Sequence, residues 1–251
     1  MKIPLLALII TTPFLGDYNL QKPVETIRYK SSDGLEIAAD LYIKHPKTAP
    51  FIVLFHQASW SRGEYREIAP RLNSLGFNCM AVDLRSGGSI NDVSNITRQN
   101  AMKTMKSTTF ADVIPDMMAS LDYAKKHLAE GKILIWGSSH SAALALKLAG
   151  DHKDKINAVV AFSPGEYFAA MGKPRDYISS SATHISQPAF ISSARDEKNN
   201  WWGIYVSIPS DHKTYFLPEE TAGNHGSRSL WSKYLGAEEY WKALEEFLAS
   251  I

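Results

Sequence analysis

The chain of 251 residues has a single cysteine, Cys79, so it lacks an intramolecular disulfide framework and any metal site built from several thiolates. It also lacks an excess of charge of one sign, because 27 Lys and Arg residues stand against 26 Asp and Glu residues. A balanced chain does not present the broad basic surface that nucleic acid requires, so nucleic acid is not an expected partner. The sequence shows no glycine-rich phosphate loop, nucleotide fingerprint or cluster of metal ligands, and we therefore expect no cofactor and no metal.

Long hydrophobic runs are lacking too, since a comfortable membrane span needs about 20 apolar residues. The N-terminus carries Lys2 and an apolar stretch over residues 3–15, and the sequence becomes polar at Asp17. This pattern resembles a secretory signal peptide. We expect residues 1–16 to be a cleaved leader and residues 17–251 to form a single domain. The protein is then exported to the periplasm or secreted, and it is cytoplasmic if the leader interpretation is wrong.

What the chain does contain is an alternation of short strand-like runs with longer helical patterns. This alternation is typical of an α/β fold with a mostly parallel sheet and helices on both faces. Continuous apolar runs indicate strands that are buried on both sides. Strands are predicted at 24–30, 36–43, 51–55, 79–82, 133–136, 158–162, 189–192 and 214–217, and helices at 64–75, 110–128, 142–149 and 238–248. The first two strands read as an antiparallel hairpin at the sheet edge. Residues 86–109 read as a long loop with one helical turn near 99–105.

The strongest chemical signal is the segment 133–143, a strand that passes through small residues directly into an alanine-rich helix. A nucleophile elbow needs this arrangement because a tight turn must project one serine hydroxyl from the sheet edge. In the pattern G-x-S-x-G, Gly137 and Ser139 match, and Ser141 stands in place of the last glycine. Ser139 is therefore the candidate nucleophile, and we interpret Ser138 and Ser141 as turn and helix-cap residues.

These residues make the sequence resemble the α/β-hydrolase superfamily, especially its compact bacterial branch of dienelactone hydrolases and small serine esterases. The resemblance covers about residue 24 to the C-terminus. It implies an α/β-hydrolase fold with roughly eight strands. Only a short insert lies between residues 164 and 187, so no large lid domain is expected.

The same resemblance supplies the remaining site residues. The family's oxyanion hole uses a backbone N–H after the strand that ends here in His56, and another just after the nucleophile, which implies Gln57 and His140. We interpret His56 as a structural residue that supports this loop. The family's chain order of serine, acid and histidine selects Asp196 and His225, each at the end of a predicted strand.

Each of these assignments has a competitor. Glu197 is adjacent to Asp196 and offers the same chemistry, and His225 has the alternative of being an ordinary turn histidine. The segment containing Asp83 and Arg85 resembles a family segment that we interpret as structural, a carboxylate and a guanidinium that brace the loop. Aromatic and methionine side chains in or near strand-end loops are candidates for an apolar acyl pocket: Trp60, Tyr65, Tyr167, Phe168, Met171, Trp201 and Trp202.

The sequence thus predicts a metal-independent serine hydrolase that cleaves small or medium carboxylic esters through an acyl-enzyme. Two alternatives stay open. The same residues serve peptide or lactone bonds in related folds, and a noncatalytic binding relative would share the fold. The expected partner is a small-molecule ester or a related acyl substrate, and the oligomeric state is left open.

Overall fold

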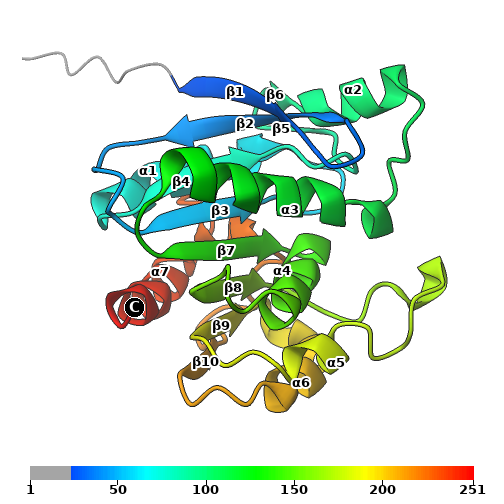
Figure 1. The fold of residues 1–251 in the computed structure, drawn as a ribbon. Helices are drawn as coiled ribbons and strands as arrows, with labels where there is room; N and C mark the ends of the chain where they lie inside the picture. The colour runs from blue at the N-terminus through cyan, green and yellow to red at the C-terminus, as the bar shows by residue number, and fades with distance from the viewer. Residues whose placement is uncertain (1–23) are drawn as a thin grey trace, which may run out of the picture.

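The computed structural model describes residues 24–251, so the predicted leader over residues 1–16 lies outside the described residues. Eight strands form one sheet in the order β1-β2-β4-β3-β7-β8-β9-β10 (Figure 1). The bounds are β1 Glu25–Lys30, β2 Glu36–Tyr42, β3 Phe51–Phe55, β4 Asn78–Val82, β7 Ile133–Ser138, β8 Ala158–Phe162, β9 Ala189–Ser192 and β10 Lys213–Phe216. The strands from β4 to β10 in this order run parallel, and β2 pairs antiparallel with both β1 and β4. The predicted edge hairpin and parallel sheet are confirmed.

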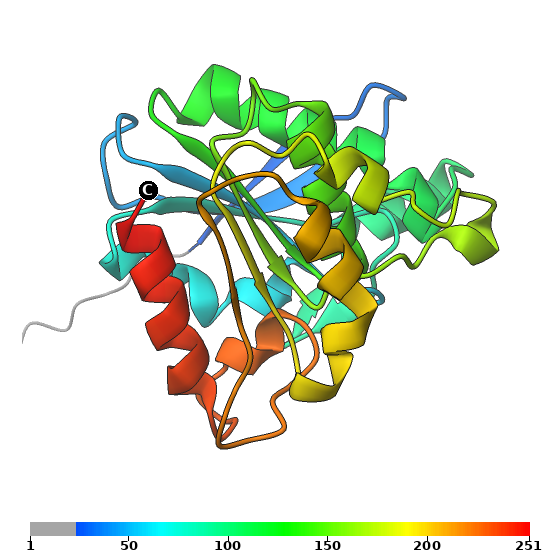
Figure 2. The ribbon, with the colours of Figure 1, turned by 90° about the horizontal axis from the view of Figure 1, so that it is seen from below.

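Helices cover both faces of the sheet. They are α1 Ile68–Ser74, α2 Ile96–Lys103, α3 Ile114–Tyr123, α4 His140–Asp151, α5 Ser179–Ala182, α6 Lys198–Ser207 and α7 Ala237–Ala249. One core joins the sheet to α3, α4, α5 and α6, and a second core joins the opposite face to α1 and α7 (Figures 1 and 2). Successive side chains of β7 alternate between the two cores: Ile133 and Ile135 point into the first, and Leu134 and Trp136 into the second.

The long segment 86–109 has more structure than the sequence predicted. It holds a small antiparallel pair, β5 Ser89–Ile90 with β6 Val93–Ser94, and then α2. The helix begins earlier than the predicted turn because the Asn95 side chain accepts a hydrogen bond from the N–H of Arg98, at 2.7 Å, and so caps the first turn.

The predicted helices at 64–75 and 110–128 are each divided. The first becomes a 3₁₀ turn, η1 Arg62–Tyr65, followed by α1, in which Pro70 has no N–H for the carbonyl of Arg66. The second becomes η2 Phe110–Asp112, α3 and a terminal π-helical turn, η3 Ala124–Leu128. Further 3₁₀ turns lie at η4 Ala169–Met171, η5 Arg195–Glu197 and η6 Ser227–Leu230.

The insert after β8 is small, as predicted: it contributes η4 and α5, and no large lid is formed by residues 24–251. In that same part of the chain, no helix is both long enough and apolar enough to cross a membrane.

Candidate active site

Ser139 lies at the sharp turn between β7 and α4. Its backbone has φ 59° and ψ −121°, a strained conformation for a residue with a side chain, of the kind expected at a nucleophile elbow. A Cβ atom on Gly137 would lie 2.2 Å from the carbonyl oxygen of Ser141, so only glycine fits there. The Ser141 hydroxyl donates to the Phe55 carbonyl at 2.8 Å and accepts from the Ser138 N–H at 2.9 Å. The serine that replaces the last motif glycine therefore ties the elbow to β3.

His225 connects the Ser139 hydroxyl to a carboxylate. Its Nε2 lies 2.8 Å from Ser139 Oγ, and its Nδ1 is hydrogen-bonded to Glu197 Oε1. Because a carboxylate only accepts, Nδ1 carries the proton and Nε2 is free to accept the proton of the serine. The structure thus brings together Ser139 and His225, two of the three residues that the sequence selected.

The third selection, Asp196, is wrong as the partner of His225. β9 leads into the 3₁₀ turn η5. Because a 3₁₀ helix has about three residues per turn, neighbouring side chains in it point in directions about 120° apart. Glu197 faces His225 from this turn, whereas Asp196 is exposed. The sequence carried a signal for the correct residue, since Glu197 was the adjacent acidic competitor.

Glu197 is held by more than the histidine. Its Oε2 accepts hydrogen bonds from Ser163 Oγ at 2.6 Å and from the Ala194 N–H at 3.2 Å. Burial opposes ionisation of this carboxyl, but the hydrogen bonds from His225 and Ser163 outweigh it and keep the pKa of Glu197 below its ordinary value. Glu197 is therefore a carboxylate at neutral pH.

Ser163 follows β8 and was missed by sequence reasoning. It is buried, with φ 56°, and its hydroxyl also accepts the Gly226 N–H at 2.8 Å. One hydroxyl thus joins the loop of the carboxylate to the loop of the histidine. A Ser-Pro pair after a strand is the only signal in the sequence, and it does not reveal these contacts.

The prediction that the Gln57 N–H belongs to the oxyanion hole is wrong in this structure, because that N–H donates to Glu64 Oε2 at 2.7 Å. The next N–H along the chain, that of Ala58, has no acceptor among residues 24–251. His56 Nδ1 bonds the Gln57 carbonyl at 2.7 Å, and a trans peptide unit directs its N–H away from its C=O. The Ala58 N–H is therefore oriented by His56, which has the loop-supporting contact that we expected.

The neutral state of His56 is fixed by its surroundings. Its Nε2 accepts the Leu84 N–H at 2.9 Å, so the proton sits on Nδ1. Burial lowers the pKa of His56 to about 4.

The second predicted oxyanion residue, His140, is the first residue of α4, and its N–H has no acceptor within the described chain.

The candidates for an acyl pocket divide into three groups by burial. Trp60 and Tyr167 are half-buried, and the Tyr167 hydroxyl donates to the Ser163 carbonyl at 2.8 Å, close to the Glu197 carboxylate. Trp201 does not line an open pocket, because it is 0% exposed and its indole N–H donates to Ser193 Oγ. The same correction applies to Tyr65 and Phe168, which are fully buried in the two cores, whereas Met171 and Trp202 are exposed.

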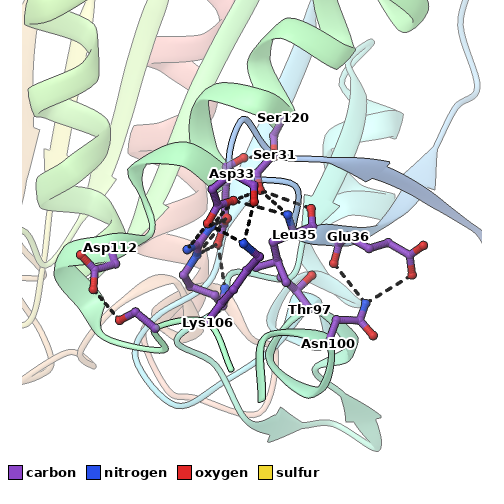
Figure 3. A network of polar contacts seen from close by, with 12 residues as sticks. Ser31, Asp33, Leu35, Glu36, Thr97, Asn100, Lys106, Asp112 and Ser120 are labelled. Atoms are coloured by element: carbon purple, nitrogen blue, oxygen red, sulfur yellow. Dashed lines mark hydrogen bonds and ion pairs between the residues drawn. The ribbon is translucent and has the colours of Figure 1, made fainter. Parts of the chain in front are cut away.

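The segment that contains Asp83 and Arg85 is structural, as interpreted, although these two residues do not pair with each other. Asp83 binds Arg62 at 2.7 Å. Arg85 binds Asp116 at 2.6 Å and Asp33 at 2.9 Å, and Figure 3 shows Asp33 and Lys106 in this network. These three ion pairs hold the loop after β4 to neighbouring elements.

A cavity of about 580 Å³ lies elsewhere, lined by Pro50, Phe77, Lys132 and Leu248 among others. Pro50, Phe77 and Lys132 precede β3, β4 and β7, so the cavity is at the amino ends of the strands, whereas Ser139 lies at their carboxyl ends. It is therefore separate from the candidate active site. No group of three or more His, Cys, Asp or Glu side chains is placed to hold a metal ion within residues 24–251.

The fold and this elbow define the chain as a member of the α/β-hydrolase superfamily. Its residues 46–192 match the family described as serine aminopeptidase, S33, and the chain belongs to that family. The match includes Ser139 and ends before Glu197 and His225.

One curated protein is similar to the chain in sequence, and solved structures share its fold. The thiohydrolase apmlB of Arthrinium phaeospermum is 30% identical over 157 residues, which are 61% of this chain and 48% of that protein, so the chain spans about half the length of this curated relative. The esterase Pf2001 of Pyrococcus furiosus is similar in structure, with a TM-score of 0.66 and 18% identity over 90% of this chain and 92% of that one. A dienelactone hydrolase from Anabaena variabilis has a TM-score of 0.65 and 14% identity over 90% of this chain and 98% of its own.

Proposed function

We propose that this protein is a serine hydrolase that cleaves carboxylic esters of small molecules through an acyl-enzyme intermediate. The observation that carries the proposal is the continuous hydrogen-bonded path from Ser139 Oγ through His225 to Glu197. A serine hydroxyl is a weak nucleophile by itself, and an adjacent base oriented by a third group activates it. The path supplies these three parts in the required order.

In the first step, Ser139 Oγ attacks the acyl carbon while His225 Nε2 takes the hydroxyl proton. The N–H groups of Ala58 and His140 are the proposed donors to the oxygen that becomes negative. The imidazolium then returns its proton to the leaving alcohol, which leaves an acyl-Ser139 ester. Water, deprotonated by His225, attacks this ester, and the imidazolium returns that proton to Ser139 Oγ as the acid is released. Glu197 stabilises the imidazolium in both halves of the reaction.

Amide hydrolysis is the second candidate, and the description of the matched family as serine aminopeptidase favours it. Thioester and lactone cleavage use the same attack and the same intermediate. These reactions differ in the leaving group, so the experiment is a panel on the purified protein with short-chain and long-chain p-nitrophenyl esters, lactones, acyl thioesters and aminoacyl amides. Turnover of short-chain or medium-chain esters is expected. Turnover confined to amides would overturn the ester assignment.

We also propose export of the protein, on the basis of the basic and apolar N-terminal pattern over residues 1–16. Cell fractionation followed by N-terminal sequencing of the recovered protein tests this proposal. Recovery in the cytoplasm with Met1 or Lys2 at the N-terminus would contradict it.

A further inference from the structure

Glu64 is a buried carboxylate beside the candidate active site that the proposed reaction does not use. It belongs to the 3₁₀ turn η1 and is 0% exposed. Its Oε2 accepts the Gln57 N–H at 2.7 Å, and its Oε1 accepts the Ser138 hydroxyl at 2.7 Å. No Lys or Arg side chain in residues 24–251 forms an ion pair with it. A buried charge without an ion pair is costly, so its retention calls for a role.

Each contact of Glu64 reaches one of the three loops of the site. Gln57 carries the peptide unit whose N–H belongs to Ala58. Ser138 immediately precedes Ser139, and its hydroxyl also accepts the N–H of Ser227, two residues after His225, at 2.9 Å. A single carboxylate therefore connects the oxyanion loop, the elbow and the histidine loop.

The packing at this junction is tight. A Cβ atom on Gly226 would lie 2.5 Å from Ser138 Oγ and 2.6 Å from Gln57 Oε1. The histidine loop is thus in direct contact with the other two loops. The indole N–H of Trp231, which follows η6, donates to the Glu64 carbonyl at 3.0 Å and fixes the backbone of the same residue.

We propose that Glu64 is a positioning residue. As a hydrogen-bond acceptor, it holds the oxyanion loop (Gln57 and Ala58), the nucleophile elbow and the His225 loop in fixed positions relative to one another. The inference rests on the proposed function, since it concerns the same reaction. An oxyanion donor that moves by a fraction of an ångström loses much of its effect on the transition state, while substrate affinity depends mainly on other contacts. Loss of the acceptor is therefore expected to lower kcat more than it changes KM.

The ionised form of Glu64 suits these contacts, because both neighbouring groups donate to it. Burial raises the pKa of Glu64 to about 7, against the hydrogen bonds from Ser138 and Gln57 and the charge of Arg228. The titratable or charged groups that face it are Arg228 from η6 and Tyr65 from its own turn. Below about pH 7 the carboxyl gains a proton and must donate, which weakens the contact with Gln57 or Ser138. Activity is therefore expected to fall on the acid side.

The test compares Glu64→Gln with Glu64→Met, using p-nitrophenyl acetate as the probe, and Glu220→Met as an exposed matched control. Glutamine keeps an oxygen for the Gln57 N–H and a polar group for Ser138, whereas methionine keeps only the volume. Glu64→Met is expected to lose about 10- to 100-fold in kcat with KM within about threefold, and Glu64→Gln, which presents a donor to Ser138 as the protonated carboxyl does, to lose about three- to tenfold at pH 8. Glu64→Gln is also expected to lose the acid limb that Glu64 contributes to the pH profile of kcat.

Two results would overturn the inference: a folded Glu64→Met with wild-type kcat, or a Glu64→Gln as inactive as Glu64→Met. An acid limb that is identical in Glu64→Gln and wild type would refute the ionised form as the working state. If Glu64→Met does not fold, Ser138→Ala decides, because it removes the links to Glu64 and Ser227. A loss of kcat supports the inference and a wild-type kcat refutes it. Ser139→Ala separates the two proposals: if that variant keeps wild-type turnover, the proposed function itself has failed.

Discussion

Glu197 Oε1 accepts the hydrogen bond of His225 Nδ1, and the aspartate one residue earlier faces solvent. A glutamate side chain has one methylene more than an aspartate side chain, and from its place on η5 the carboxylate of Glu197 reaches the ring of His225. Its second oxygen is occupied by Ser163 Oγ and the Ala194 N–H, which leaves the carboxylate in one orientation. The ring of His225 is therefore aligned toward Ser139 before any substrate binds.

The identity of the nucleophile is tested with Ser139→Ala. We expect this variant to fold, because alanine keeps the Cβ at the strained turn, and to lose all labelling by a fluorophosphonate probe. The measurement is gel fluorescence after labelling, with circular dichroism as the check on folding. Labelling that persists would move the nucleophile to another serine, Ser138 or Ser141 first.

The identity of the acid is tested with Glu197→Gln, with Asp196→Asn as the matched control. Glutamine is able to present an N–H to the imidazole and so favours the wrong tautomer, and we expect kcat to fall by about three to four orders of magnitude. Asp196→Asn is expected to stay within about twofold of wild type, since surface substitutions are usually mild. The reverse ranking of the two variants in ester turnover would restore Asp196 as the acid.

The role of Ser163 is tested with Ser163→Ala. The substitution removes the donor to Glu197 and the acceptor of the Gly226 N–H, but it keeps the Cβ and therefore the same strain at φ 56°. We expect kcat to fall about fivefold, with a small change in KM, because one buried hydrogen bond contributes about 1 kcal/mol. The exposed Ser180→Ala is the control. Equal kcat in both variants would assign Ser163 to folding alone.

Acid stability is expected to depend on Asp33. Hydrogen bonding to Arg85 holds the pKa of Asp33 well below its ordinary value, despite slight burial. A lowered folded-state pKa means that the stabilisation is present above the unfolded value, about 4, and is lost as the pH falls below it. Because Asp33 is partly exposed, we expect at most about 1 kcal/mol, or roughly 2–4 °C in Tm.

Calorimetry of Asp33→Asn and wild type from pH 7 to pH 2.5 measures this contribution. The two Tm values are expected to differ at pH 7 and to converge below pH 4, while the exposed Asp211→Asn follows wild type throughout. A difference in Tm that stays constant across the whole range would mean that Asp33 acts through packing and not through its charge.

The sequence predicted the sheet well because its strands are buried on both faces. β3, β8 and β9 have the predicted bounds, since each is a short apolar run between polar or turn residues. Helix α6 was missed because its exposed face is also apolar: Trp202 and Val206 are exposed while Trp201 and Ile204 are buried. Periodicity cannot reveal a helix whose two faces have similar composition.

The site was predicted less completely, and for a physical reason. Strand order selects the loops that carry the acid and the oxyanion donor, but it does not select the side chain or the N–H within each loop. Asp196 and Glu197 differ by one position on a 3₁₀ turn, and the choice between them depends on the direction of that turn. The Gln57 N–H is occupied by Glu64, a contact between loops that no local pattern encodes.

The alternation along β7 also determines how substitutions on the two sides of the sheet combine. Leu148 of α4 and Leu244 of α7 pack in separate cores, on opposite faces of the sheet. Their truncations share no contact partner within a core, so their effects on unfolding free energy should sum with little interaction energy. Stabilising substitutions are thus open to separate screening in each core, and the best ones from the two cores are then combined, as long as the backbone of β7 between the cores is left unchanged.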